Sequence, residues 1–136
     1  SAISSNLNII GSDYINSLKG GKGADTLEGG AGNDTLTGGN GKDVFVYSGG
    51  NDVITDYKDG EDEIKLSGDT ITNTTYNKSD VIFTIGNGTL TVKNAKDKDI
   101  SVTDASGDTQ TYSRTLDIFD LWNAISPITE NSFLIY

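Results

Sequence analysis

Residues 20–46 decide the fold of this chain: they read GGKGADTLE, GGAGNDTLT and GGNGKDVFV, three nine-residue units without a break. Each unit has an aspartate at its sixth place and an apolar residue at its eighth. The apolar place recurs at the same spacing on both sides of these units, at Ile9, Leu18, Leu27, Leu36, Phe45 and Ile54. A period of nine is too long for a strand or a helix alone, and it fits a six-residue turn followed by a three-residue strand.

The residue types in each unit suit a turn that binds a metal ion. Glycine tolerates positive φ and lets its carbonyl approach an ion without a side chain in the way. Aspartate supplies a hard anionic oxygen, which suits Ca²⁺. In the strand, the apolar residue points inward and its neighbours, such as Thr26 and Glu28, point outward.

One unit cannot bury its apolar residue, but a stack of units can. Because the chain reverses after each turn, two units make one coil, and alternate turns lie above each other roughly 4.8 Å apart, the spacing of strands. Turns 11–16, 29–34 and 47–52 then share one side, and turns 20–25, 38–43 and 56–62 share the other. Four inter-turn ion sites are expected, formed by Asp34 with Asp52, by Asp25 with Asp43, by Asn16 with Asp34, and by Asp43 with Asp56 or Asp62.

The units match the nonapeptide G-G-x-G-x-D-x-U-x, and the chain resembles the RTX family of calcium-binding repeats. The resemblance implies a right-handed parallel β-roll of two short sheets over residues 8–67 and three to four bound Ca²⁺. It also implies that turn carbonyls complete the shell around the aspartate oxygens. These carbonyls belong to Gly20, Gly21, Lys22, Gly23, Gly29, Gly30, Ala31, Gly32, Gly38, Gly39, Asn40 and Gly41, with Gly50 in the fifth turn. Residues 54–67 are similar to the segment that ends the roll in type I-secreted proteases and toxins.

Other readings of a glycine-rich acidic stretch fit less well. Collagen has a period of three, whereas the period here is nine and the chain has a single proline. A flexible linker has no reason to keep an apolar residue in phase six times. A solvated acidic face has no reason to place its acids in phase with the glycines.

Composition limits the remaining classes. The 136 residues carry a net charge of −10, which makes nucleic acid and anionic membrane poor partners. The chain has no cysteine and no apolar stretch near ~20 residues, so neither a disulfide framework nor a membrane span is expected. A cysteine-free chain held by Ca²⁺ suits export in an unfolded state. Because it begins at Ser1 without a signal peptide, we interpret it as a monomeric C-terminal piece of a longer secreted protein.

After residue 67 the glycine repeats give way to a period of two. We expect an all-β molecule with a roll domain at 1–67 and an antiparallel β cap at 68–136. The expected cap strands are 70–76, a hairpin of 80–85 and 89–93, and a hairpin of 100–103 and 109–112. One short helix should begin near Thr115 and end before Pro127. Residues 130–136 are typical either of a type I secretion signal or of a final strand.

Catalysis is not expected, because the chain has no histidine and no cysteine and its phased aspartates are better explained as Ca²⁺ ligands. Two functions remain. The first is an extracellular module whose Ca²⁺-triggered folding serves type I secretion of an upstream effector. The alternative is a polysaccharide-binding or adhesin module, like the similar modules of alginate epimerases, although the outward lysines form no basic stripe.

Overall fold

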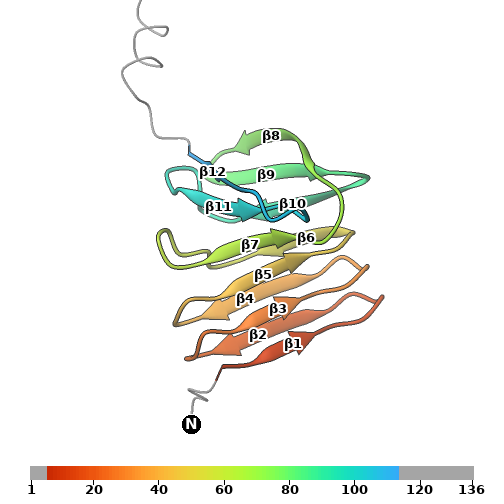
Figure 1. The fold of residues 1–136 in the computed structure, drawn as a ribbon, viewed down its shortest axis with the longest axis vertical. Coiled ribbons are helices and arrows are strands. Elements are labelled where there is room, and N and C mark those ends of the chain that lie inside the picture. The colour runs from red at the N-terminus through yellow and green to blue at the C-terminus, as the bar shows by residue number, and fades with distance from the viewer. Residues whose placement is uncertain (1–5, 114–136) are drawn as a thin grey trace, which may run out of the picture.

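The computed structural model describes residues 6–113, which form two six-stranded sheets and no helix. The first sheet contains, in spatial order, β1 (Asn8–Ile10), β3 (Thr26–Glu28), β5 (Val44–Tyr47), β7 (Glu63–Leu66), β11 (Ile100–Thr103) and β12 (Thr109–Tyr112). The second contains β2 (Ser17–Gly21), β4 (Thr35–Gly39), β6 (Asn51–Ile54), β10 (Gly88–Val92), β9 (Asp80–Ile85) and β8 (Ile71–Asn77). Up to β7, consecutive strands lie in opposite sheets, so the chain winds as a parallel β-roll (Figure 1).

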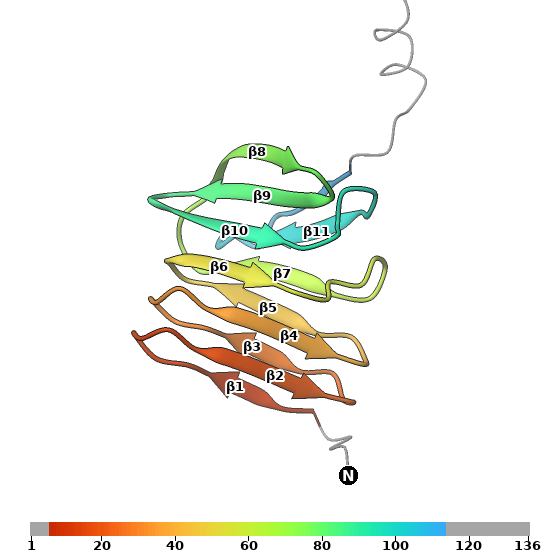
Figure 2. The same ribbon diagram turned by 180° about the vertical axis from the view of Figure 1, so that it is seen from behind.

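The register of the roll follows the sequence period. Leu18 pairs with Leu36, and Leu27 pairs with Phe45, so each residue lies beside the one found 18 positions later. Two nine-residue units therefore make one coil, as predicted, and the coils stack along the long axis of the molecule (Figure 2). Turns that belong to alternate units consequently lie above each other.

The last coil of the roll contains one additional residue. Phe45 pairs with Ile64, which lies 19 positions later. The extra residue is taken up in the loop between β6 and β7, where Asp62 stands in the place that a strict repeat would give to residue 61. This loop is therefore the irregular turn of the array.

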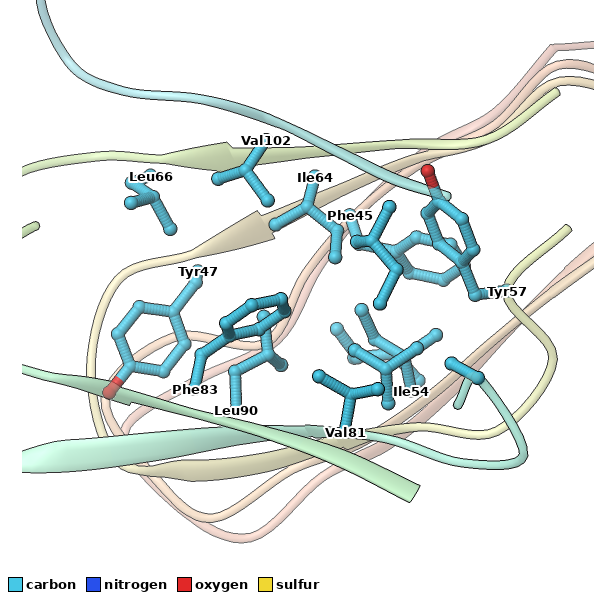
Figure 3. Packing of buried hydrophobic residues seen from close by; sticks show 14 of the residues in the cluster. Phe45, Tyr47, Ile54, Tyr57, Ile64, Leu66, Val81, Phe83, Leu90 and Val102 are labelled. Atoms are coloured by element: carbon cyan, nitrogen blue, oxygen red, sulfur yellow. The ribbon is translucent and has the colours of Figure 1, made fainter. Parts of the chain in front are cut away.

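The space between the sheets is filled by the apolar side chains at the eighth position of each nine-residue unit. Leu27, Leu36, Phe45 and Ile54 are buried, and side chains from both sheets point toward one another there (Figure 3). Tyr47 and Tyr57 lie at opposite ends of the cluster in this view. Stacking thus buries what a single unit leaves exposed.

The cap extends the roll before it becomes antiparallel. β10 pairs parallel with β6, and β11 pairs parallel with β7, so both sheets continue across residue 67. Antiparallel pairing begins on the far side of these two strands: β10 pairs with β9, β9 pairs with β8, and β11 pairs with β12. The predicted hairpins are confirmed to within one residue, whereas the parallel docking of their inner strands was not predicted.

Some predictions fall outside the described residues. The helix expected from Thr115 to Pro127 and the signal-like segment 130–136 are among them. Over residues 6–113, no helix is long and apolar enough to cross a membrane.

Candidate calcium sites in the turns

The aspartate that closes each turn joins two coils through one carboxylate oxygen. Its Oδ1 accepts a hydrogen bond from the backbone N–H of the equivalent residue in the preceding coil. The five bonds run from the amides of Leu7, Asn16, Asp25, Asp34 and Asp43 to the Oδ1 atoms of Asp25, Asp34, Asp43, Asp52 and Asp62, over 2.8–2.9 Å. Since the aspartates recur with the strands, these bonds form a ladder along both sides of the roll.

The other oxygen, Oδ2, has no such partner in four of these aspartates. The Oδ2 atoms of Asp25, Asp34, Asp43 and Asp52 are buried and accept no hydrogen bond, and each residue is only 1% exposed. A buried carboxylate oxygen without a partner is costly, and buried charges are normally paired or bound to metal. Four buried carboxylate oxygens are therefore available to bind a cation.

At two inter-turn junctions, a backbone carbonyl of the following coil lies close to the side-chain oxygen that closes the turn. A Cβ added to Gly20 would lie 2.4 Å from Asp25 Oδ2 and 2.4 Å from the carbonyl oxygen of Gly38, one coil later. On the other side, a Cβ at Gly11 would lie 2.4 Å from Asn16 Oδ1 and 2.5 Å from the Gly29 carbonyl oxygen. Only glycine leaves this space free, and an ion in it would contact oxygens from two coils.

The outer part of each turn also depends on glycine. Gly39 has a φ of 87°, and its added Cβ would lie 2.3 Å from the Gly21 carbonyl oxygen. Here the conformation and the space both exclude other residues. The carbonyls of Gly23 and Gly32 lie in the same way against Gly41 and Gly50 of the following coil.

The donor set fits Ca²⁺. Among residues 6–113, no three acidic side chains come together at one point, so carboxylates alone cannot surround an ion. Calcium takes 6–8 oxygen ligands and accepts backbone carbonyls readily. One aspartate oxygen with the surrounding turn carbonyls supplies the required kind of donor.

Burial makes two of these carboxylates, those of Asp52 and Asp43, hard to ionise without a cation. The pKa of Asp52 is raised to about 7, mainly by desolvation; the hydrogen bond from the Asp34 N–H opposes the rise, and the nearby charge of Asp34 adds to it. Asp52 lies among apolar side chains that include Phe45 and Leu90. Desolvation likewise raises the pKa of Asp43 to about 6, with contributions from the charges of Asp62 and Asp25. A bound divalent cation would remove this penalty.

Three predicted side-chain ligands already have hydrogen-bond partners. Asn16 Oδ1 accepts the N–H of Ser12 at 2.7 Å. Asp56 accepts the N–H groups of Gly38 and Gly39, one on each oxygen, at 2.9 and 2.8 Å. Asp62 accepts the N–H of Lys58 through Oδ2 at 2.9 Å, in addition to its bond from Asp43. The structure thus separates these residues from the four aspartates that have a free oxygen.

The remaining predicted residues lie along the turns. A Cβ added to Gly29 would lie 2.2 Å from Asp34 Oδ2, and a Cβ added to Gly38 would lie 2.3 Å from Asp43 Oδ2. Gly30 lies against the Ser12 carbonyl. The carbonyls of Lys22 and Ala31 point toward Gly41 and Gly50, and Asn40 donates its N–H to the Gly21 carbonyl.

Sequence reasoning missed two side chains that close the array. The Tyr47 hydroxyl donates to the Gly50 carbonyl at 2.7 Å, and the Lys58 ammonium donates to the Gly39 carbonyl. Both carbonyls were predicted as ion ligands. One feature of the sequence could have indicated them: the fifth and sixth turns begin with Tyr47 and Asp56, where the earlier turns begin with glycine.

A parallel roll whose turns aim buried carboxylates and carbonyls at shared points is a metal-binding β-solenoid. The family model of the RTX calcium-binding nonapeptide repeat, four copies long, matches residues 10–45 and again residues 19–54. Residues 10–54 are therefore an RTX calcium-binding repeat array, which confirms the resemblance seen in the sequence. None of the curated proteins matches the chain.

Two solved structures show similarity. The extracellular lipase LipA from Serratia marcescens is 21% identical over 64% of this chain, with a TM-score of 0.47. The AlgE6R3 subunit of the Azotobacter vinelandii mannuronan C5-epimerase is 19% identical over 85% of this chain and 88% of its own, with a TM-score of 0.46. This chain spans only 18% of the length of the lipase chain.

Proposed function

We propose that this chain is an extracellular module that folds when it binds Ca²⁺. The observation that carries the proposal is the set of four buried Oδ2 atoms without a hydrogen-bond partner, on Asp25, Asp34, Asp43 and Asp52. Three to four ions bind between turns one coil apart. Their ligands are these carboxylates and the turn carbonyls from Gly20 to Gly23, Gly29 to Gly32 and Gly38 to Gly41.

The expected energies are large enough for a folding switch. Extracellular calcium modules bind with a Kd of roughly 10⁻⁴–10⁻³ M. At millimolar Ca²⁺, one site with a Kd near 10⁻⁴ M adds about 1.4 kcal/mol to the free energy of unfolding. Three or four such sites add about 4–6 kcal/mol, comparable to the whole stability of a small domain.

The switch suits a secreted protein. In a cytosol with little Ca²⁺, the glycine-rich array must meet its chain-entropy cost without ions, and the four buried carboxylates oppose folding. The chain would then pass the type I secretion machinery unfolded and fold outside, together with an upstream effector. The module itself has no catalytic role in this proposal.

A polysaccharide-binding role has less support. A polyanionic sugar would need a row of positive charges along the roll. The outward places of successive strands hold Lys19, Glu28, Thr37 and Val46, which form no such row.

Circular dichroism during a Ca²⁺ titration tests the switch. Residues 1–136 should gain β structure between about 0.1 and 1 mM Ca²⁺, and Mg²⁺ should not replace it, because Mg²⁺ demands a smaller octahedral shell and keeps its waters. Full β structure in chelator, or equal folding with Mg²⁺, would refute the proposal.

A further inference from the structure

The junction between turns 38–43 and 56–62 differs from the other inter-turn junctions. In the last turn, Asp56 takes the N–H groups of Gly38 and Gly39 on its two oxygens. Two residues later, the half-buried Lys58 donates from its ammonium to the Gly39 carbonyl and from its backbone N–H to Asp62 Oδ2. The Asp56 carboxylate thus binds two backbone N–H groups of turn 38–43, and the Lys58 ammonium binds a carbonyl of the same turn.

The oxygen geometry divides the four inter-turn junctions into two pairs. At Gly20, the added Cβ meets Asp25 Oδ2 together with a carbonyl oxygen of the next coil. At Gly38, the nearest atoms are Oδ2 and Cγ of Asp43 and the ring of Phe45. The three nearest atoms at Gly29 all belong to Asp34, so an oxygen of the following coil is among the nearest atoms at Gly11 and Gly20 but not at Gly29 and Gly38. The contacts of Asp56 and Lys58, rather than the absence of this oxygen, therefore distinguish the junction at turn 56–62.

The ammonium lies where its charge affects the surrounding acids. Desolvation raises the pKa of Asp43 and of Asp62, and the positive charge of Lys58 partly opposes that rise in both. The Oδ2 atom of Asp43 is buried without a hydrogen-bond partner. Within residues 6–113, the Lys58 ammonium forms no ion pair with a carboxylate; the ion pair found there joins Lys93 to Asp80. Lys58 therefore joins the two turns through the hydrogen bond from its ammonium to the Gly39 carbonyl, not through a salt bridge.

We propose that the Lys58 ammonium is the resident cation of this junction, so that turn 56–62 closes onto turn 38–43 without Ca²⁺. This inference rests on the proposed calcium function and refines it: three inter-turn junctions hold an ion and the fourth holds a lysine. The three calcium-dependent junctions then stack on an end of the roll that needs no metal.

The ion count of variants tests this assignment. Lys58→Met removes the charge, keeps the aliphatic stem, and frees the Gly39 carbonyl from its hydrogen bond with the ammonium. By native mass spectrometry at saturating Ca²⁺, the wild type should bind three ions and Lys58→Met four. Lys58→Arg, which keeps the charge, and Lys65→Met, which removes an exposed lysine from β7, should each bind three. Equal counts for the wild type and Lys58→Met would overturn the inference.

A second exchange locates the extra ion. Asp62→Asn should leave the wild-type count unchanged and should remove the fourth ion in the Lys58→Met background. Where Lys58→Met does not fold, anomalous diffraction from the Ca²⁺-loaded wild type decides the question. An ion between the Gly39 carbonyl and Asp43 would overturn the role of Lys58 alone, whereas a wild type that binds no Ca²⁺ would overturn the proposed function as well.

Discussion

Each turn aspartate uses its two carboxylate oxygens for different purposes. In Asp34, Oδ1 accepts the Asn16 N–H at 2.8 Å and so holds two coils together, whereas Oδ2 is buried with no hydrogen-bond partner. An asparagine at this place would keep the acceptor oxygen and lose the charge. The structural role and the ionic role can therefore be separated by a single exchange.

Asp34→Asn is expected to have opposite effects with and without Ca²⁺. In millimolar Ca²⁺ it should lose about 1–3 kcal/mol of unfolding free energy, because Asp34 belongs to a middle turn and serves one or two ions. In chelator it should be at least as stable as the wild type, because it no longer buries an unpaired charge. Thermal unfolding under both conditions measures this, with the exposed Asp108→Asn as control. A loss of the same size under both conditions would show that Asp34 serves only the hydrogen-bond ladder.

The pH dependence of the metal-free chain follows from Asp43 and Asp52. Burial raises their pKa values to about 6 and about 7, above the ordinary 3.8. The folded chain therefore holds more protons than the unfolded chain between about pH 4 and pH 7, and its stability falls as the pH rises through this range. In Ca²⁺-free buffer, β structure measured by circular dichroism should be greater at pH 5.5 than at pH 7.5. The double variant Asp43→Asn, Asp52→Asn should lose most of this difference, and a rise of β structure toward pH 7.5 would contradict the sign.

Among the elements, β10 and β11 attach the cap to the roll. β10 begins at Gly88, whose added Cβ would lie 2.1 Å from the Gly50 carbonyl oxygen and 2.3 Å from the Tyr47 hydroxyl. The Thr89 N–H donates to the same carbonyl at 3.2 Å. Phe83 and Tyr112 meet edge to face, with ring centroids 5.0 Å apart, and so connect β9 to β12 across the two sheets.

Gly88→Ala should loosen this attachment. The new methyl group would force the cap away from the Gly50 carbonyl, at a cost of about 1–3 kcal/mol, the usual range for overpacking. Gly68→Ala is the matched control, because nothing lies within 4 Å of its added Cβ. Thermal unfolding in saturating Ca²⁺ should show a lower Tm for Gly88→Ala and an almost unchanged Tm for Gly68→Ala; equal values would mean that the cap docks elsewhere.

The sequence predicts most of the regular elements because one short pattern carries both the turn and the strand. Glycine, aspartate and an inward apolar residue at fixed places determine the 18-residue register, and alternation beyond residue 67 predicts the hairpins. The parallel docking of β10 on β6 depends on contacts between distant segments, for which the sequence has no local signal. Lys58 and Tyr47 were missed for the same reason, because their partners, the Gly39 and Gly50 carbonyls, are defined only by the folded turns.

The molecule as a whole carries a charge of −10, which favours cations near its surface and opposes compaction without them. Salt screens this field, with a Debye length of about 10 Å at 0.1 M and about 3 Å at 1 M. Ionic strength therefore acts on every calcium site together.

Raising NaCl from about 0.05 to about 0.5 M should increase the Ca²⁺ concentration at the folding midpoint severalfold, because the long-range attraction for the ion is screened. Circular dichroism titrations at fixed pH measure the midpoint. A midpoint independent of salt would mean that local ligands alone determine the affinity.

The 18-residue register also makes the roll a spacer with a built-in orientation. Each added pair of units lengthens the stack by one strand spacing, about 4.8 Å, and keeps its two ends facing the same way. A single added unit instead turns one end by half a revolution about the axis. The number of repeats therefore determines both how far apart two attached domains lie and whether they face the same side.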